Sequence, residues 1–87
     1  MSNLTVKAYV LAIVKKGTEH RVAEALRENE EDVVDVLVTY GVWDLVIRIE
    51  TSSMEKLDKI VTVIRQIPEI EQTHTLIGFK NTQIEGP

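Results

Sequence analysis

Apolar residues recur along the chain with two different periods, and their order predicts four strands. Residues 6–14 are apolar at nearly every position, which is typical of a strand with both faces covered. Residues 33–39 are rich in β-branched side chains, and residues 43–50 alternate apolar and polar positions. A last strand is predicted over residues 72–80, with Thr73, Thr75, Ile77 and Phe79 on one face and His74, Leu76 and Lys80 on the other.

Two stretches between these strands have the period of an amphipathic helix. The stretches cover residues 19–28 and 53–66. Thr18 is the expected N-cap of the first helix, and Ser52 with Glu55 forms an expected capping box for the second. Their apolar faces consist of Val22, Ala25 and Leu26, and of Leu57, Ile60, Val61 and Ile64.

The connection between the second and third strands predicts a hairpin. Residues 40–42 are too few for anything but a tight turn, and Gly41 suits a position that needs positive φ. The element order is therefore β-α-β-β-α-β, the ferredoxin-like arrangement of the α+β class. We expect a four-stranded antiparallel sheet with both helices on one face.

The first strand has apolar side chains on both of its faces. Val6, Ala8, Val10, Ala12 and Val14 point to one side, whereas Tyr9, Leu11 and Ile13 point to the other. For the second strand, alternation places Val34, Val36 and Val38 opposite Val33 and Leu37. Helices cover only one face of such a sheet, and the other face would be a larger apolar patch than a monomer usually exposes. We therefore expect a homodimer in which two sheets pack face to face, a dimeric α/β barrel.

Composition narrows the possible functions. The 87 residues fit one domain, expected over residues 1–80 with a loose tail over 81–87, and the absence of Cys excludes disulfides and thiolate metal sites. A net charge of -4 disfavours direct binding of DNA or RNA. Because the sequence contains neither a membrane-length apolar run nor a signal-peptide pattern, we expect a cytoplasmic protein without membrane contact.

The sequence offers little support for a metal or a cofactor. His20 and His74 have no partner at a metal-ligand spacing, and the acidic run 28–32 lacks the framework of a calcium loop. The four glycines are isolated, so no phosphate-binding loop is present. His74 is expected to be a packed or interface histidine, and neither metal nor cofactor is predicted.

Five segments in this order resemble the effector-binding domain of the Lrp/AsnC transcription regulators. They are Ala8-Tyr9-Val10-Leu11, Val22-Ala23-Glu24-Ala25-Leu26, the hairpin from Thr39 to Val46, Ile67-Pro68-Glu69-Ile70, and Thr73-His74-Thr75-Leu76-Ile77. Each segment alone is weak, but their order and spacing cover nearly the whole chain.

The resemblance implies an assembly and a binding site. In that family the sheets form dimers, dimers join into rings such as octamers, and small effectors, usually amino acids, bind in clefts between dimers. The hairpin and the Thr-x-Thr of the last strand are parts of that cleft. The implied ligand-binding residues of this chain are Gly41, Val42, Trp43, Asp44, Thr73 and Thr75.

Each of these residues also has a simpler interpretation. Gly41 and Asp44 could form an ordinary hairpin in which the carboxylate bonds the backbone. Trp43 begins an apolar face and fits core or interface packing. The two threonines are common strand residues.

Two features depart from the family pattern. Full-length members carry an N-terminal helix-turn-helix, whereas this sequence begins at the first strand, so a stand-alone effector domain acting through a DNA-binding relative is expected. The second helix shows Lys59, Thr62, Val63 and Gln66 near the expected cleft, without the carboxylate that would suit a basic amino acid.

The predicted function is therefore small-molecule sensing by an oligomer, with an amino acid as the expected effector and no enzymatic activity. One alternative is a cofactor-independent enzyme of the dimeric α/β barrel type, for which His74 and Asp44 are the only plausible pair. The other alternative is a purely structural assembly module.

Overall fold

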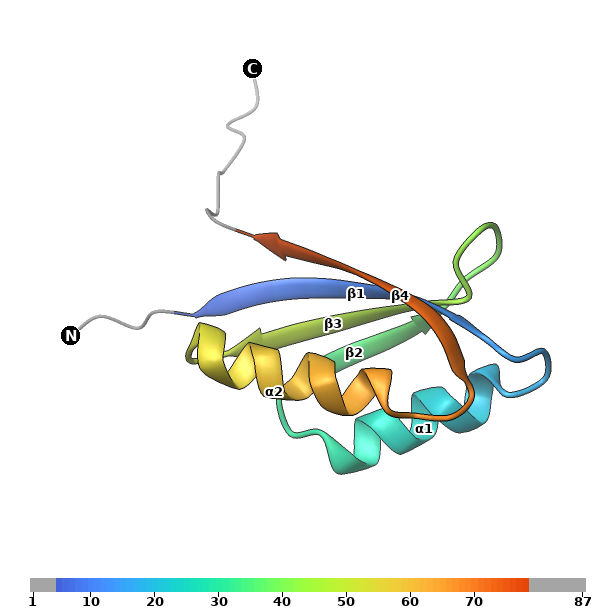
Figure 1. Ribbon diagram of the computed structural model, residues 1–87, viewed down its shortest axis with the longest axis horizontal. Coiled ribbons are helices and arrows are strands. Elements are labelled where there is room, and N and C mark those ends of the chain that lie inside the picture. Colours follow the sequence, from blue (N-terminus) through green and yellow to red (C-terminus); the bar gives the residue numbers. More distant parts are fainter. Residues whose placement is uncertain (1–4, 79–87) are drawn as a thin grey trace, which may run out of the picture.

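The computed structural model describes residues 5–78 and contains the six expected elements in the expected order (Figure 1). They are β1 (Val6–Val14), α1 (Glu19–Asn29), β2 (Val33–Val38), β3 (Leu45–Thr51), α2 (Met54–Arg65) and β4 (Ile70–Gly78). β1 has the predicted bounds, and β4 begins two residues earlier than predicted. Phe79, Lys80 and the expected tail over residues 81–87 lie outside the described residues.

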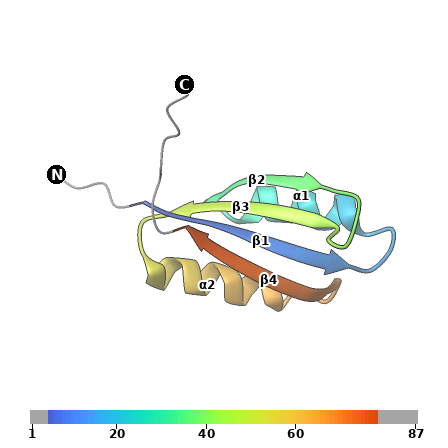
Figure 2. The ribbon, with the colours of Figure 1, turned by 90° about the horizontal axis from the view of Figure 1, so that it is seen from above.

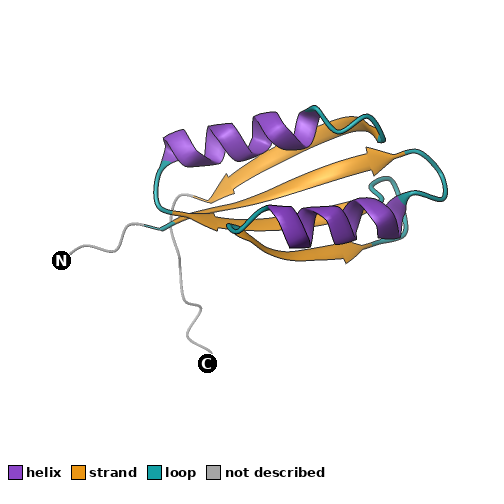
Figure 3. Cartoon of the chain, turned by 90° about the horizontal axis from the view of Figure 1, so that it is seen from below, coloured by secondary structure: helices purple, strands orange, loops and turns teal. Residues whose placement is uncertain are grey.

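The four strands form one antiparallel sheet in the order β2-β3-β1-β4. Both helices lie on the same face of this sheet (Figure 3). α1 packs mainly beside β2, and α2 contacts β1, β3 and β4 (Figure 2). The predicted ferredoxin-like α+β fold is confirmed.

A single hydrophobic core fills the space between the helices and the sheet. On β1 the inward side chains are Ala8, Val10, Ala12 and Val14, which are all buried. The other buried apolar residues are Val22, Ala23, Leu26, Val33, Val36, Leu45, Ile47, Ile49, Leu57, Ile60 and Ile64. Neither helix in residues 5–78 has the length and apolar character that would let it cross a membrane.

The expected alternation along β2 is wrong. Val33 and Val36 are both buried, whereas Val34, Leu37 and Val38 are exposed. The register explains the difference: Val33 pairs with Ile49 but Asp35 pairs with Arg48, so one extra residue is accommodated between them. Because of this irregularity, the residues that follow it point to the face opposite the one that strict alternation from Val33 would give.

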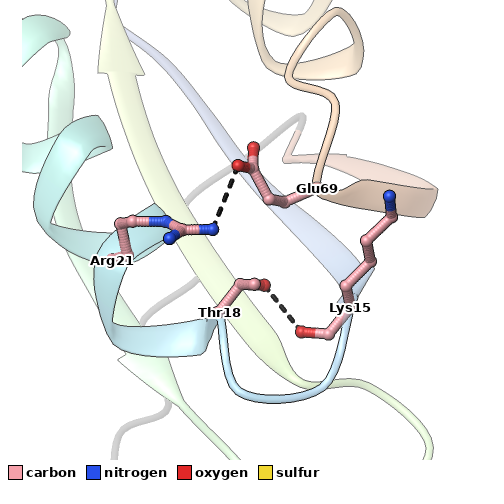
Figure 4. Close-up of polar contacts among 4 residues, drawn as sticks. All are labelled: Lys15, Thr18, Arg21 and Glu69. Carbon is pink, nitrogen blue, oxygen red and sulfur yellow. Dashed lines mark hydrogen bonds and ion pairs between the residues drawn. The ribbon is translucent and has the colours of Figure 1, made fainter.

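The helix caps also differ in detail from the prediction. Ser53 rather than Ser52 caps α2, because the helix begins at Met54 and the Ser53 hydroxyl accepts a hydrogen bond of 3.1 Å from the Lys56 N–H. Thr18 does stand at the N-cap position of α1. Its hydroxyl, however, donates to the Lys15 carbonyl at 2.6 Å and makes no capping bond (Figure 4).

Two contacts join the turn before α1 to the loop before β4. The Lys15 N–H donates to the Glu69 carbonyl at 2.9 Å, which extends the pairing of β1 with β4. The Arg21 guanidinium lies 3.2 Å from the Glu69 carboxylate (Figure 4). Because the Arg21 side chain is largely exposed, the ion pair adds little stability.

Adjacent positions of α2 provide a test of the core. Ile64→Ala is expected to lower the free energy of unfolding by about 2–5 kcal/mol, because this fully buried side chain would leave a cavity. The matched control Val63→Ala, at a half-exposed position, should change it by no more than about 0.5 kcal/mol. Urea unfolding at one fixed protein concentration measures both, and equal losses would contradict the observed packing.

Candidate functional site

The face of the sheet opposite the helices is open in the single chain and carries a band of apolar side chains. Within residues 5–78, no element covers this face. Tyr9, Leu37 and Leu76 are 45%, 57% and 48% exposed there. Strand pairing places Leu11 beside Val46 on one side, and the register continues this band from Val46 to Leu37. The band therefore crosses the sheet from β2 to β1.

Charged residues of the open face lie beside this band and compensate one another. The Arg48 guanidinium is 2.7 Å from the Glu50 carboxylate on the same strand. Asp35 pairs with Arg48 in the register of β2 and β3, which brings a second carboxylate onto the neighbouring strand. The positive charge of Arg48 is thus balanced within one chain.

The hairpin between β2 and β3 is closed by hydrogen bonds at its base. The Thr39 N–H donates to the Asp44 carbonyl at 2.9 Å, and the Thr39 hydroxyl donates to the Trp43 carbonyl at 2.6 Å. Gly41 has a φ of +119°, as the sequence predicted for this turn. The neighbouring side chains of Tyr40 and Val42 are almost entirely exposed, so the loop tip projects from the sheet.

Asp44 fastens this loop to the end of β1. Its N–H donates to the Ala12 carbonyl, and one oxygen of its carboxylate accepts a hydrogen bond of 2.9 Å from the Val14 N–H. The simpler interpretation, an Asp44 carboxylate that bonds the backbone of its own hairpin, is therefore not what the structure shows. The bond reaches a distant strand rather than the local turn.

Trp43 lies against His74 of β4. Their ring centroids are 6.1 Å apart and the ring planes are inclined by 31°. His74 pairs with Leu11, so it lies on the open face, and the contact spans β1 to connect the hairpin loop with β4. Within residues 5–78, no hydrogen bond joins His74 to Asp44, the pair that a catalytic interpretation would require.

Thr73 and Thr75 lie on the opposite side of β4 from His74. They pair with Ala12 and Val10, whose side chains are buried under the helices. Both threonines are partly buried. In one chain the six predicted ligand residues are thus divided between the projecting hairpin and the helix-facing side of β4.

Val14 connects these two groups. Its N–H holds the Asp44 carboxylate, and its register partner on the other side is Ile70, at the start of β4. The hairpin base and the beginning of β4 therefore lie at the same end of the sheet, on either side of β1.

A shallow pocket of about 360 Å³ lies at this end and includes Thr73. Arg65, Ile70, Glu71 and Gln72 complete its lining. No pattern in the sequence marked Arg65 or Glu71 as lining residues of a pocket. Arg65 is an ordinary cation in the last turn of a helix, and Glu71 an ordinary exposed residue of a strand. A larger hollow of about 550 Å³ is lined by α1 alone, so it has no second wall within the described chain.

No metal site is evident in the part of the chain that the structure describes. Among residues 5–78, no three His, Cys, Asp or Glu side chains come together in a geometry that could hold a metal ion.

Comparison with known proteins identifies the family of this chain. Residues 7–86 match the Lrp/AsnC ligand binding domain, so the chain belongs to the Lrp/AsnC family. This confirms the resemblance found in the sequence. Proteins of this family are regulators that commonly form oligomers and bind small-molecule effectors.

The curated relatives and solved structures support the same assignment. The HTH-type transcriptional regulator FL11 of Pyrococcus abyssi is 40% identical over 73 residues, which are 84% of this chain and 48% of FL11. The hypothetical protein PHS023 of Pyrococcus horikoshii is 35% identical with a TM-score of 0.81, covering 87% of this chain and 92% of that one. TTHA0845 of Thermus thermophilus is 29% identical with a TM-score of 0.84, covering 91% and 99%.

The comparisons support a role at the level of the family. The chain spans about half the length of the curated relatives it matches. The relatives are transcription regulators, which confirms the expectation that the chain is not an enzyme. A ligand-binding, regulatory role follows from the family.

The Asp44–Val14 bond can be tested by substitution. Asp44→Ala would leave the Val14 N–H without its acceptor and is expected to lower the free energy of unfolding by about 1–3 kcal/mol. Asp44→Asn keeps an acceptor oxygen and should recover most of that loss. Urea unfolding gives the stabilities, and amide exchange at Val14 should accelerate in the alanine variant alone. Equal exchange in both variants would contradict the assigned bond.

Proposed function

We propose that this domain forms a homodimer through its open sheet face and, in that form, senses a small effector, which we expect to be an amino acid. The observation that carries the proposal is the apolar band across the open face. β1 is a central strand, and its Tyr9 and Leu11 lie next to β3 and β4 on a face that no element of residues 5–78 covers.

A second copy is the partner that best fits this surface. Apolar side chains gain free energy when they leave water, roughly in proportion to the area buried. A sheet face bearing Tyr9, Leu11, Val46 and Leu76 can pack against its own copy through two-fold symmetry, as sheets pack in sandwiches. The small size of the domain favours such association as well.

The charged residues of the open face are compatible with burial. Arg48 has its partner Glu50 at 2.7 Å in the same chain, so packing does not require a new counter-ion from the second copy. A buried charge without a partner would strongly oppose dimerisation, whereas a pair that is already hydrogen-bonded opposes it less. Arg48 would therefore keep a counter-ion when the sheet face is covered.

The projecting hairpin supports the effector part of the proposal. The exposed Tyr40 and Val42 surround Gly41, whose backbone N–H can reach a ligand carboxylate without interference from a side chain. This loop, together with Trp43, Asp44, Thr73 and Thr75, would line the expected effector cleft. The cleft would be completed by a neighbouring dimer in a larger ring. The second oxygen of the Asp44 carboxylate could accept hydrogen bonds from a ligand ammonium.

DNA recognition would be supplied outside the described domain. The domain carries a net charge of -4, and phosphate backbones select positively charged surfaces. FL11 is named an HTH-type regulator, and this chain matches about half of it. We propose that the domain acts in the cytoplasm and modulates transcription through a helix-turn-helix region of a related regulator.

A charge on the open face tests the dimer. Leu76→Glu is expected to raise the dimer dissociation constant by about 100-fold or more, because its register neighbour on β1 is Tyr9 and the buried carboxylate would have no cation opposite it. Met54→Glu, at an equally exposed apolar position at the start of α2, is the matched control and should leave association unchanged. Sedimentation equilibrium between micromolar and millimolar concentrations measures both, and equal behaviour of the two variants would refute the assigned face.

Calorimetric titration tests the effector. Each of the twenty amino acids is titrated into the purified dimer at up to 10 mM, and at least one should give a saturable heat. The backbone N–H groups of the hairpin and the paired hydroxyls can compensate the charges of such a ligand. Absence of heat with all twenty, in a protein that still assembles, would favour a purely structural module.

A further inference from the structure

His74 is a titratable side chain on the sheet face that no element of residues 5–78 covers. It lies within β4 and pairs with Leu11 of β1, on the side of the sheet away from the helices. Its side chain is exposed in the single chain. The sequence contains two histidines, and the other one, His20, is exposed on α1. Between about pH 5 and 8, side-chain titration is therefore expected mainly at these two residues.

The immediate surroundings of His74 on this face are uncharged. Leu11 lies opposite it on β1, and Gln72 and Leu76 flank it on the same side of β4. The ring of Trp43 lies against it, with 6.1 Å between the ring centroids. Within residues 5–78, no carboxylate comes close enough to the imidazole to form an ion pair. In the single chain, a positive charge on His74 would therefore be solvated mainly by water.

Charged groups of the surrounding elements act on His74 in the single chain already. Asp44, next to Trp43 in the hairpin, has its carboxylate held by the Val14 N–H at 2.9 Å. The charged side chains of α2 lie on the opposite side of the sheet (Figure 3). The remaining charged residues of the open face and of β4 are Lys7, Asp35, Arg48, Glu50 and Glu71. All of these groups belong to the same chain as His74, so they accompany it before and after a second copy binds.

We propose that His74 makes the dimer sensitive to pH, because the neutral imidazole fits a covered sheet face and the protonated imidazole favours separate chains. The inference rests on the proposed homodimer and adds its regulation. Covering the open face removes water from His74, and loss of water disfavours the charged form of a histidine. Trp43 and Asp44 are neighbours of His74 in both states. The loss of water is therefore the difference on which the response depends.

Proton linkage gives the direction and the size of the effect. A histidine side chain is ordinarily half protonated near about pH 6.5. Below that pH each chain would have to release a proton from His74 before the sheet faces could close, so acid weakens the dimer and neutral pH leaves it at full strength. If the dimer admitted no proton at all, its dissociation constant would rise about 100-fold between pH 8 and pH 5.5.

A role in packing alone predicts a different result. If His74 served only as a flat ring against Trp43, the dissociation constant would not depend on its charge. His74→Gln keeps a polar side chain that does not titrate in this range, and His74→Phe keeps an aromatic ring. His20→Gln removes the other histidine, which lies on α1 and not on the sheet face, and is the matched control.

The experiment measures the dimer dissociation constant of the full chain by sedimentation equilibrium at pH 8.0, 6.5 and 5.5 and constant ionic strength. We expect a rise of at least about 10-fold from pH 8.0 to pH 5.5 in the wild type and in His20→Gln. In His74→Gln and His74→Phe the constant should change by less than about 2-fold over the same range. A fixed, moderate urea concentration brings a tighter dimer into the measurable range, and circular dichroism at each pH excludes unfolding as the cause.

The outcomes separate this inference from the dimer on which it rests. A dimer with the same dissociation constant at all three pH values would overturn the pH response and keep the dimer. A response that persists in both His74 variants, or that disappears in His20→Gln, would also overturn it, since another group would then be responsible. A tighter dimer at pH 5.5 would contradict the direction. A wild type that stays monomeric at pH 8.0 and millimolar concentration would refute both the dimer and its regulation.

Discussion

The structure depends on a strand that is apolar on both faces in a sheet whose helices cover only one. β1 lies between β3 and β4, and its inward residues, such as Val10, are fully buried under the helices. Its outward residues, Tyr9 and Leu11, belong to a band that one chain leaves open to water. In the proposed dimer a second copy buries this band, and such an assembly would create clefts between subunits.

The end of the sheet where β1 finishes combines several constraints on the site. The Val14 N–H holds the Asp44 carboxylate on one side, while Val14 pairs with Ile70 on the other. The hairpin and the start of β4 are therefore fixed relative to each other through a single residue of the core strand. At the proposed site, a ligand that contacts either group would act on the same segment of backbone.

Much of the fold could be predicted because hydrophobic period and turn residues are local properties. The six elements, the hairpin and the positive φ of Gly41 follow from such patterns. Features that depend on pairing between strands could not be predicted. An irregular register between β2 and β3 decides which face the residues after Val33 point to, and another between β1 and β4 leaves Glu71 as an extra residue. Ser53 rather than Ser52 caps α2, because the helix begins one residue later than expected. For the site, the resemblance indicated the hairpin and Thr73, but no pattern in the sequence indicated that Arg65, at the end of α2, lines the same hollow as Thr73.

A dimer formed through the open sheet faces is tested most directly by detecting contacts between two copies. A dimer assembled from equal parts of ¹³C-labelled and unlabelled protein allows isotope-filtered nuclear Overhauser spectra to select contacts between chains. We expect such contacts among Tyr9, Leu11, Val46 and Leu76 of the open sheet face. Intermolecular contacts confined to the helices, or none in a protein that remains a monomer at millimolar concentration, would contradict it.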